Sequence, residues 1–283
     1  MRYCLYAMCR FLVLLIASSL AGQQFRNSFF VFDNGTGRDE KIPLAEQAHL
    51  VERTGFDGIG FTGTQHIPEV LKEMDARGLK LFSIYVAAHV DGETPSFDAG
   101  LPEAIAQLKG RDTVIWLTVQ GKAPADGDRR ASEIVRKIAD MAAASSLRVV
   151  LYPHVGFYVD RLEGALRVRQ LADRPNIGVT FNLAHFLAAG DERNLDQRLK
   201  EAAPYLQMVS INGADHAGDW QHGDWSTLIQ TLDKGQFDVR GLLMKLHNLG
   251  YAGPIGLQCY RVPGDREENL KRSMTAWRKL TSK

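Results

Sequence analysis

Short apolar runs alternate with longer segments of helical periodicity from Phe29 to the carboxyl terminus. The runs are rich in β-branched and aromatic residues, which is typical of strands, and each is followed by a helix candidate. The predicted strands lie at residues 29–33, 58–62, 79–87, 113–120, 149–154, 178–182, 208–212 and 254–260. Strands that alternate with helices form parallel βα units, and eight such units predict a (β/α)8 TIM barrel of the α/β class.

One predicted connection is unusually long. Residues 213–237, between the seventh strand and its helix, include Trp220, His222 and Trp225. Long βα loops in barrels commonly form lids or walls of an active site, whereas the alternative is a loop that only packs over the rim. We expect this loop to be a lid or wall.

The amino terminus has the pattern of a signal peptide at residues 1–21. Arg2 and Arg10 precede an apolar run at residues 11–16, and small residues follow as far as Ala21. This pattern predicts cleavage after Ala21 and a periplasmic or secreted protein with one barrel domain at residues 25–283. The apolar run is short for a membrane span, so we expect no span after cleavage, although an uncleaved anchor is the alternative. Cleavage would leave Cys259 as the only cysteine, so no intramolecular disulfide is expected.

Composition and charge narrow the class of partner. Hydrophobic residues make up 45% of the 283 positions, which is enough apolar material for one barrel core. The formal net charge is +1 and the charges are spread along the chain, so the sequence has no cluster of basic residues of the kind that binds nucleic acid. Phosphate-binding and dinucleotide-binding glycine motifs are absent from the sequence, so no nucleotide cofactor is expected. The expected partner is a small molecule, near-neutral or mildly anionic.

Four consecutive predicted strands end in polar residues that share one face, because side chains alternate along a strand. These residues are Tyr152 with His154, Thr180 with Asn182, Ser210 with Asn212, and Gln258 with Tyr260. A barrel interior is ordinarily apolar, so polar side chains there need hydrogen-bond partners. A bound polyhydroxylated ligand would supply them, and the alternative is that the side chains bond one another and buried water. Agreement of four strands at one depth favours the ligand.

Four motifs carry a resemblance to a known family. They are Leu-Tyr-Pro-His at 151–154, Phe-Asn-Leu-Ala-His at 181–185, Ile-Asn-Gly-Ala-Asp at 211–215 and Gly-Leu-Gln-Cys-Tyr at 256–260. Together they resemble the xylose isomerase-like TIM barrel superfamily, and in particular an exported branch labelled sugar phosphate isomerase/epimerase. The resemblance covers essentially the whole mature chain. It implies a sugar or keto-sugar substrate.

The resemblance also implies a metal. Ketose epimerases of this superfamily hold one divalent ion with Glu, Asp, His and Glu from strands five to eight. The corresponding positions by strand order are Tyr152, Asn182, Ser210 or Asn212, and Gln258, and all are neutral. Two histidines beside them, His154 and His185, would suit one Zn²⁺ or Mn²⁺ ion together with an amide oxygen of Asn182 or Gln258, and Asp215 could add negative charge; Mg²⁺ is the other candidate. Metal binding and a metal-free site are therefore both open.

The predicted catalytic residues are His154, His185 and Asp215, with Asp33 as a further acid. An ordinary histidine pKa of about 6.5 suits general acid or base catalysis near neutral pH. The predicted substrate-binding residues are Tyr152, Asn182, Asn212, Gln258, Tyr260, His66 and Lys122. Each histidine taken alone has a structural alternative as a hydrogen-bonded residue of the rim.

Three functions follow from these residues and the resemblance. The first is a carbohydrate isomerase or epimerase, in which a base removes the proton alpha to a sugar carbonyl and polar groups or a metal hold the enediolate. The second is a lyase or hydratase that acts on a 3-keto glycoside after the same first step. The third is a sugar-binding barrel without catalysis. The related endonuclease barrels need several zinc ions held by Glu, Asp and His, a set that this chain lacks.

Overall fold

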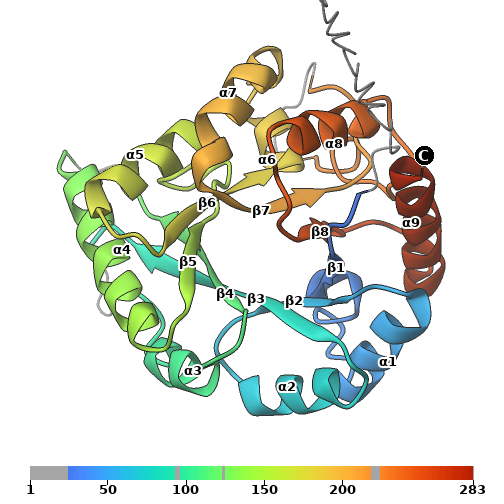
Figure 1. The fold of residues 1–283 in the computed structure, drawn as a ribbon, viewed down its shortest axis with the longest axis horizontal. Coiled ribbons are helices and arrows are strands. Elements are labelled where there is room, and N and C mark those ends of the chain that lie inside the picture. The colour runs from blue at the N-terminus through green and yellow to red at the C-terminus, as the bar shows by residue number, and fades with distance from the viewer. Residues whose placement is uncertain (1–24, 93–95, 123–124, 218–223, 283) are drawn as a thin grey trace, which may run out of the picture.

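The computed structural model describes residues 25–92, 96–122, 125–217 and 224–282. Within these residues, parallel strands close into a barrel in chain order and helices surround them (Figure 1). The strands are β1 (Phe29–Phe32), β2 (Gly58–Thr62), β3 (Lys80–His89), β4 (Val114–Gln120), β5 (Arg148–Leu151), β6 (Ile177–Asn182), β7 (Leu206–Ile211) and β8 (Ile255–Leu257). The predicted (β/α)8 barrel is thereby confirmed.

The helices lie on the outside of this barrel. They are α1 (Leu44–Thr54), α2 (Ile67–Asp75), α3 (Leu101–Gln107), α4 (Gly127–Ala144), α5 (Leu162–Ala172), α6 (Leu183–Ala188), α7 (Leu195–Ala202), α8 (Val239–Asn248) and α9 (Arg266–Thr281). Short 3-10 turns occur at Asp33–Gly35, Glu192–Asn194 and Ala203–Tyr205. The predicted signal peptide at 1–21 lies outside the described residues. In the part that is described, no helix is long and apolar enough to cross a membrane.

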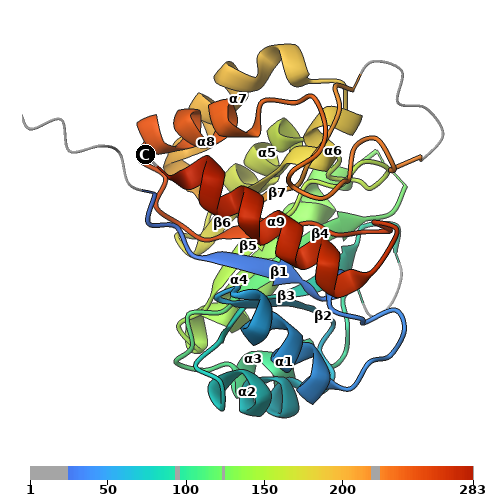
Figure 2. The ribbon, with the colours of Figure 1, turned by 90° about the vertical axis from the view of Figure 1, so that its right-hand side faces the viewer.

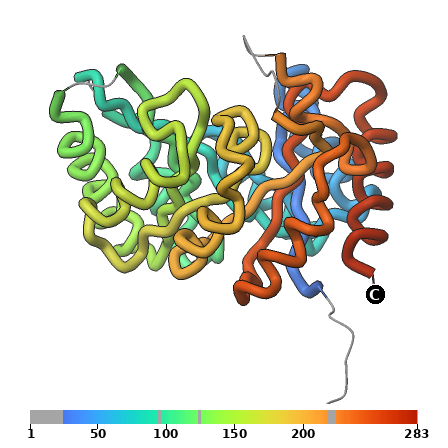
Figure 3. The backbone as a smooth tube through the Cα atoms, turned by 90° about the horizontal axis from the view of Figure 1, so that it is seen from above, coloured from blue at the N-terminus to red at the C-terminus, as the bar shows by residue number. Residues whose placement is uncertain are grey.

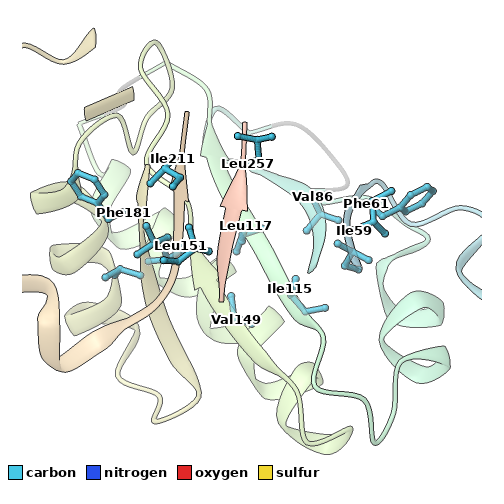
Figure 4. Close-up of a cluster of buried hydrophobic side chains, with 14 of the residues drawn as sticks. Ile59, Phe61, Val86, Ile115, Leu117, Val149, Leu151, Phe181, Ile211 and Leu257 are labelled. Carbon is cyan, nitrogen blue, oxygen red and sulfur yellow. The ribbon is translucent and has the colours of Figure 1, made fainter. Parts of the chain in front are cut away.

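Outward-facing strand residues form the larger apolar core between the barrel and its helices. Figure 4 shows part of this layer, with Ile115 and Leu117 of β4 beside Val149 and Leu151 of β5. These residues are one position out of phase with the inward-facing set, as the two-residue period of a strand requires. The predicted alternation therefore assigns the two faces of β5 correctly.

The inside of the barrel is a second apolar cluster, and it is rich in aromatic rings. Its members are Phe30, Phe32, Phe82, Val114, Trp116, Val150, Tyr152 and Met208. The ring of Phe30 fits because β8 has Gly256 beside it: a Cβ built there would lie 2.5 Å from Phe30 Cζ. These rings fill the barrel up to the carboxyl ends of the strands, so a ligand can bind only above them.

Two strands end three residues earlier than predicted. β5 ends at Leu151 rather than at residue 154, and β8 ends at Leu257 rather than at 260. At β8 the cause is the side chain of Gln258, whose Oε1 accepts hydrogen bonds from the backbone N–H groups of Cys259 (2.9 Å) and Tyr260 (3.0 Å). A side chain thus replaces the neighbouring strand as hydrogen-bond acceptor, and the chain turns away from the sheet.

The two ends of the described chain meet at one side of the barrel. Strand β1 pairs with β8, and Figures 2 and 3 show α9 lying outside β1. The ring of Trp277 in α9 stacks on Phe29 of β1 with centroids 4.2 Å apart. The last helix therefore covers the point at which the barrel closes.

Candidate functional site

A cavity of about 260 Å³ opens at the carboxyl ends of the strands. Aromatic side chains make up much of its lining: Phe32, Tyr85, Trp116, Tyr152, Trp225 and Tyr260. Trp225 and Ile229 come from the long connection after β7, so this loop forms part of the wall, as predicted from its length. Trp220 and His222 lie outside the described residues. The position agrees with the general rule that barrel active sites lie at this end of the strands.

Asn182, at the end of β6, is the centre of a buried network of neutral groups. Its Nδ2 donates to the phenol oxygen of Tyr152 and to Oγ of Ser210, both at 2.5 Å. Its Oδ1 accepts from the backbone N–H of His185 at 2.9 Å and thereby caps the first turn of α6. Every polar atom of this amide therefore has a protein partner.

Gln258 joins the same network from β8. Its Oε1 accepts from Nδ2 of Asn34 at 2.8 Å, in addition to the two backbone N–H groups of the turn after β8. Its side chain also bonds Tyr152. Burial raises the pKa of Tyr152 well above its usual value, so the phenol keeps its proton. The polar cluster of Tyr152, Asn182, Ser210 and Gln258 is therefore neutral.

This polar cluster does not fit the divalent metal that the family implies. The cluster occupies the ends of β5 to β8 without a carboxylate, and both amide oxygens already accept hydrogen bonds. The rings of His154 and His185 lie 3.8 Å apart between centroids with planes tilted by 38°, so they pack against each other. Among the described residues, no three His, Cys, Asp or Glu side chains group together as metal ligands would.

The two histidines line the cavity as uncharged rings. The Nδ1 atom of His154 lies 2.9 Å from the carbonyl oxygen of Val155, which can only accept, so this nitrogen carries the proton. The Nε2 atom of His154 therefore has a free lone pair. Burial lowers the pKa of His154, and burial together with the neighbouring His154 lowers the pKa of His185 well below its usual value. Both rings are bases, not acids, at neutral pH.

An ion pair lies across the cavity from the histidines, because β1 is opposite β5 in a closed ring of this order. Asp33, which is 1% exposed, accepts from Nη1 of Arg38 at 3.1 Å and from the backbone N–H of Thr62 at 2.6 Å. Burial raises the pKa of Asp33, although the charge of Arg38 opposes this. Among the described residues that line the cavity, Arg38 is the only permanent cation.

The other predicted site residues fall into two groups. Tyr260 lines the cavity together with Tyr152, His154, His185 and Gln258, while the polar atoms of Asn182 lie directly beneath. Asn212, Asp215, His66 and Lys122 are not among its described lining residues.

Asn212 and Asp215 instead hold the loop after β7. Nδ2 of Asn212 donates to the carbonyl oxygen of Leu228 at 2.6 Å, and Oδ2 of Asp215 accepts from Gln230 at 2.9 Å. His66 and Lys122 are exposed. Strand parity could not place these four side chains, because each of them lies beyond the end of its strand.

Sequence reasoning missed Arg38, Tyr85 and Trp116 as parts of the site. The parity that selected Tyr152 applies equally to Tyr85 on β3 and Trp116 on β4, so an aromatic pattern was available. Arg38 gives no comparable signal, because it comes from the loop after β1 and its place depends on the ion pair with Asp33.

Comparison with known proteins gives the same fold. The sequence profile of the family described as xylose isomerase-like TIM barrel matches residues 48–280. A 3-keto-D-glucoside 4-epimerase from E. coli superposes with a TM-score of 0.71 at 17% identity, covering 90% of this chain and 99% of that one. A search of curated proteins gave no match.

Two other solved structures are similar to the same degree. A probable 3-DHS dehydratase from Bacillus anthracis superposes with a TM-score of 0.70 at 13% identity, covering 88% of this chain and 98% of that one. The IolI protein with a bound zinc atom gives 0.70 at 16% identity, covering 90% and 98%. These identities show a shared fold, while the residues of the site must be judged on their own chemistry.

Proposed function

The chain belongs to the xylose isomerase-like TIM barrel family, and from this we propose that it is a carbohydrate isomerase or epimerase that moves a proton alpha to a sugar carbonyl. The observation that carries the proposal is His154, a neutral imidazole with a fixed tautomer whose Nε2 lone pair is available in an aromatic-lined cavity. Solved structures of similar fold include sugar epimerases and a dehydratase, which supports the substrate class.

In the proposed reaction His154 takes the proton at Nε2 and an enediolate forms at the neighbouring carbonyl. The phenol of Tyr152 donates to the oxygen on which negative charge develops, since burial keeps this group protonated. Aromatic rings around the cavity pack on the apolar face of the sugar ring and exclude water from the enediolate. Return of the proton to the other face of the carbon, or to the neighbouring carbon, completes epimerisation or isomerisation.

Solvent deuterium exchange tests this proposal. The purified protein is incubated in D2O with a panel of ketoses and 3-keto glycosides, and incorporation alpha to the carbonyl is followed by NMR. We expect exchange that falls by about 100-fold or more in His154→Ala, since general base catalysis contributes that much. His49→Gln is the matched control, because His49 lies on the outside of α1 with a 62% exposed side chain.

Other outcomes would replace the proposal. Release of an aglycone from a 3-keto glycoside would identify a lyase or hydratase instead. Tight binding of a sugar with no exchange from any member of the panel would identify a non-catalytic binder. Exchange that persists at full rate in His154→Ala would remove His154 as the base.

We also propose that the reaction proceeds without a divalent metal, because the amide oxygens of the polar cluster are already occupied by protein donors. Dialysis against a chelator should leave the deuterium exchange rate unchanged within about twofold, since no protein group would lose its partner. Elemental analysis of the same samples is the control. One metal per chain, lost together with activity, would contradict this prediction.

A further inference from the structure

The ring of His185 lies between two cavities. One is the main cavity, and the other is a space of about 20 Å³ between the start of α5 and the end of β6. The smaller space is large enough for one water molecule, which needs roughly 10–15 Å³. His185 is 5% exposed and lines both spaces.

The nitrogen Nδ1 of His185 is buried and has no hydrogen-bond partner among the described residues. A buried imidazole nitrogen without a partner costs about 1–3 kcal/mol, so this atom points to a bound group that is not part of the protein. The backbone N–H of His185 bonds Asn182, while its ring lies edge-on to Tyr152 at an interplanar angle of 77° and tilted by 38° against His154. None of these contacts satisfies Nδ1.

A second unpartnered atom lines the same small cavity. Glu163, in the first turn of α5, has one oxygen bound to Nη2 of Arg198 at 2.5 Å, whereas its Oε2 is buried and without a partner. The lining has two other carboxylates: both oxygens of Asp191 are occupied, by Asn194 (2.6 Å) and Arg198 (2.8 Å), and the side chain of Asp160 is 50% exposed and can be hydrated from outside. Glu163 is therefore the acceptor that this cavity offers.

We propose that one water molecule binds in the small cavity, accepts the proton of His185 Nδ1 and donates to Oε2 of Glu163. Glu163 is then a positioning residue, because it acts on the ring of His185 through the water. The bridge fixes the proton on Nδ1 and leaves the lone pair of Nε2 for the main cavity.

Under the proposed function, on which its catalytic meaning rests, the bridge gives the site a second base. His154 is held in the Nδ1-protonated form by the carbonyl of Val155, and His185 is held in the same form by the water and Glu163. The proton that one imidazole removes can pass to the neighbouring one, which then returns it at a different position of the substrate.

NMR of the substrate-free protein tests the bridge directly. Long-range ¹⁵N–¹H spectra of histidine-labelled protein distinguish a protonated ring nitrogen from a bare one, and His185→Gln assigns the signals. We expect Nδ1 of His185 to be protonated and Nε2 to be bare. In Glu163→Leu we expect the proton to move toward Nε2, whereas Glu163→Gln, which retains an acceptor oxygen, should keep the original form.

The matched control is Glu201→Ala. Glu201 also pairs with Arg198, at 3.0 Å, but it does not line the small cavity, so this variant tests whether disturbing Arg198 is enough. We expect the tautomer of His185 to be unchanged in it. Protonation of Nε2 in the parent protein, or identical spectra for Glu163→Leu and the parent, would overturn the proposal.

The catalytic consequence has its own measurement. Deuterium exchange should fall in Glu163→Leu by on the order of tenfold to a hundredfold, with a smaller change in Glu163→Gln. If no substrate shows exchange, the proposed function fails while the tautomer result still stands. If exchange is found but the tautomer of His185 does not depend on Glu163, the bridge alone is wrong.

Discussion

Asn182 illustrates how far one side chain decides the chemistry of this barrel. A carboxylate at the end of β6 would need a metal or an ion pair, whereas the amide donates to Tyr152 and Ser210 and accepts from the backbone of α6. The polar cluster therefore satisfies itself without a charge. The groups left to transfer a proton are His154 and His185, which burial keeps uncharged at neutral pH.

The buried histidines predict how stability depends on pH. Burial lowers the pKa of both His154 and His185 in the folded protein, so the unfolded chain binds more protons between the folded pKa values and about 6.5. Stability must then rise with pH through this window and fall on acidification below 6.5. The slope is at most about 1.4 kcal/mol per pH unit for each histidine.

Urea unfolding between pH 5 and 7 measures this slope. The free energy of unfolding should depend less on pH in His154→Ala and in His185→Ala than in the parent protein. The slopes are compared and not the absolute values, because each variant also loses packing. His49→Gln should keep the parent slope, and a parent whose stability falls with rising pH across this range would contradict the assignment.

The ion pair between Arg38 and Asp33 predicts how a single substitution changes stability. Asp33 is buried, and without Arg38 its carboxylate would keep only the hydrogen bonds from Thr62. Removing one partner of a buried pair costs about 3 kcal/mol, so Arg38→Met should lower the free energy of unfolding by roughly that amount. In the background of Asp33→Asn the same change should cost less than about 1 kcal/mol, and equal costs in both backgrounds would show that the pair is not coupled.

The alternation of side chains was enough to bring Tyr152, His154, Asn182 and Gln258 together from sequence. It left open whether they bond one another or a ligand, since that depends on distances across the barrel. The structure shows that three of these side chains bond one another. The position of Arg38 could not be predicted from the sequence, because it depends on a turn and on the ion pair with Asp33, and neither follows a periodic pattern.

At the level of the elements, strand periodicity predicted every strand and the ends of β2, β4 and β6, but not the ends of β5 and β8. β5 and β8 stop where side-chain and loop hydrogen bonds replace the ladder, as the turn at Gln258 shows. The pattern of hydrophobic residues does not show where a side chain or a loop will replace the neighbouring strand as hydrogen-bond partner. The same limit applies to the loop after β7, whose length predicted a wall but not the contacts made by Asn212 and Asp215.

The glycine of β8 gives a test of how the inside of the barrel is packed. A Cβ at Gly256 would lie 2.5 Å from Phe30 Cζ and 2.7 Å from Phe32 Cε1, so Gly256→Ala forces these rings to move. We expect a loss of about 1–3 kcal/mol in the free energy of unfolding by urea, as is typical of overpacked cores. The double variant Gly256→Ala with Phe30→Leu should recover part of that loss, and simple additivity of the two costs would contradict the steric explanation.

For the molecule as a whole, the barrel depends on closure between its first and last strands. β1 and β8 pair over only three registered positions, and α9 covers them from outside. Because these elements are far apart in sequence, their contact must form across almost the entire chain. Packing between α9 and β1 is therefore expected to stabilise the closed barrel and not merely one helix.

Trp277 tests this expectation. Its ring is 8% exposed and stacks on Phe29 at 4.2 Å, so Trp277→Ala removes a large buried contact at the point of closure. We expect a loss of about 3–5 kcal/mol in the free energy of unfolding. The control is Leu171→Ala in α5, whose side chain is 46% exposed and should cost less than about 0.5 kcal/mol.

The form of the transition is as informative as its midpoint. If closure is part of one cooperative unit, Trp277→Ala should shift a single transition that is the same by tryptophan fluorescence and by circular dichroism. Separate transitions for the two probes would mean that α9 detaches before the barrel opens. Asn34, in the turn after β1, bonds Gln258, which follows β8 and lines the cavity. Early separation of β1 from β8 would therefore also disturb the cavity. Exchange activity measured below the unfolding midpoint should then fall in Trp277→Ala ahead of global unfolding, and activity that follows the folded fraction would instead show that the barrel opens as a whole.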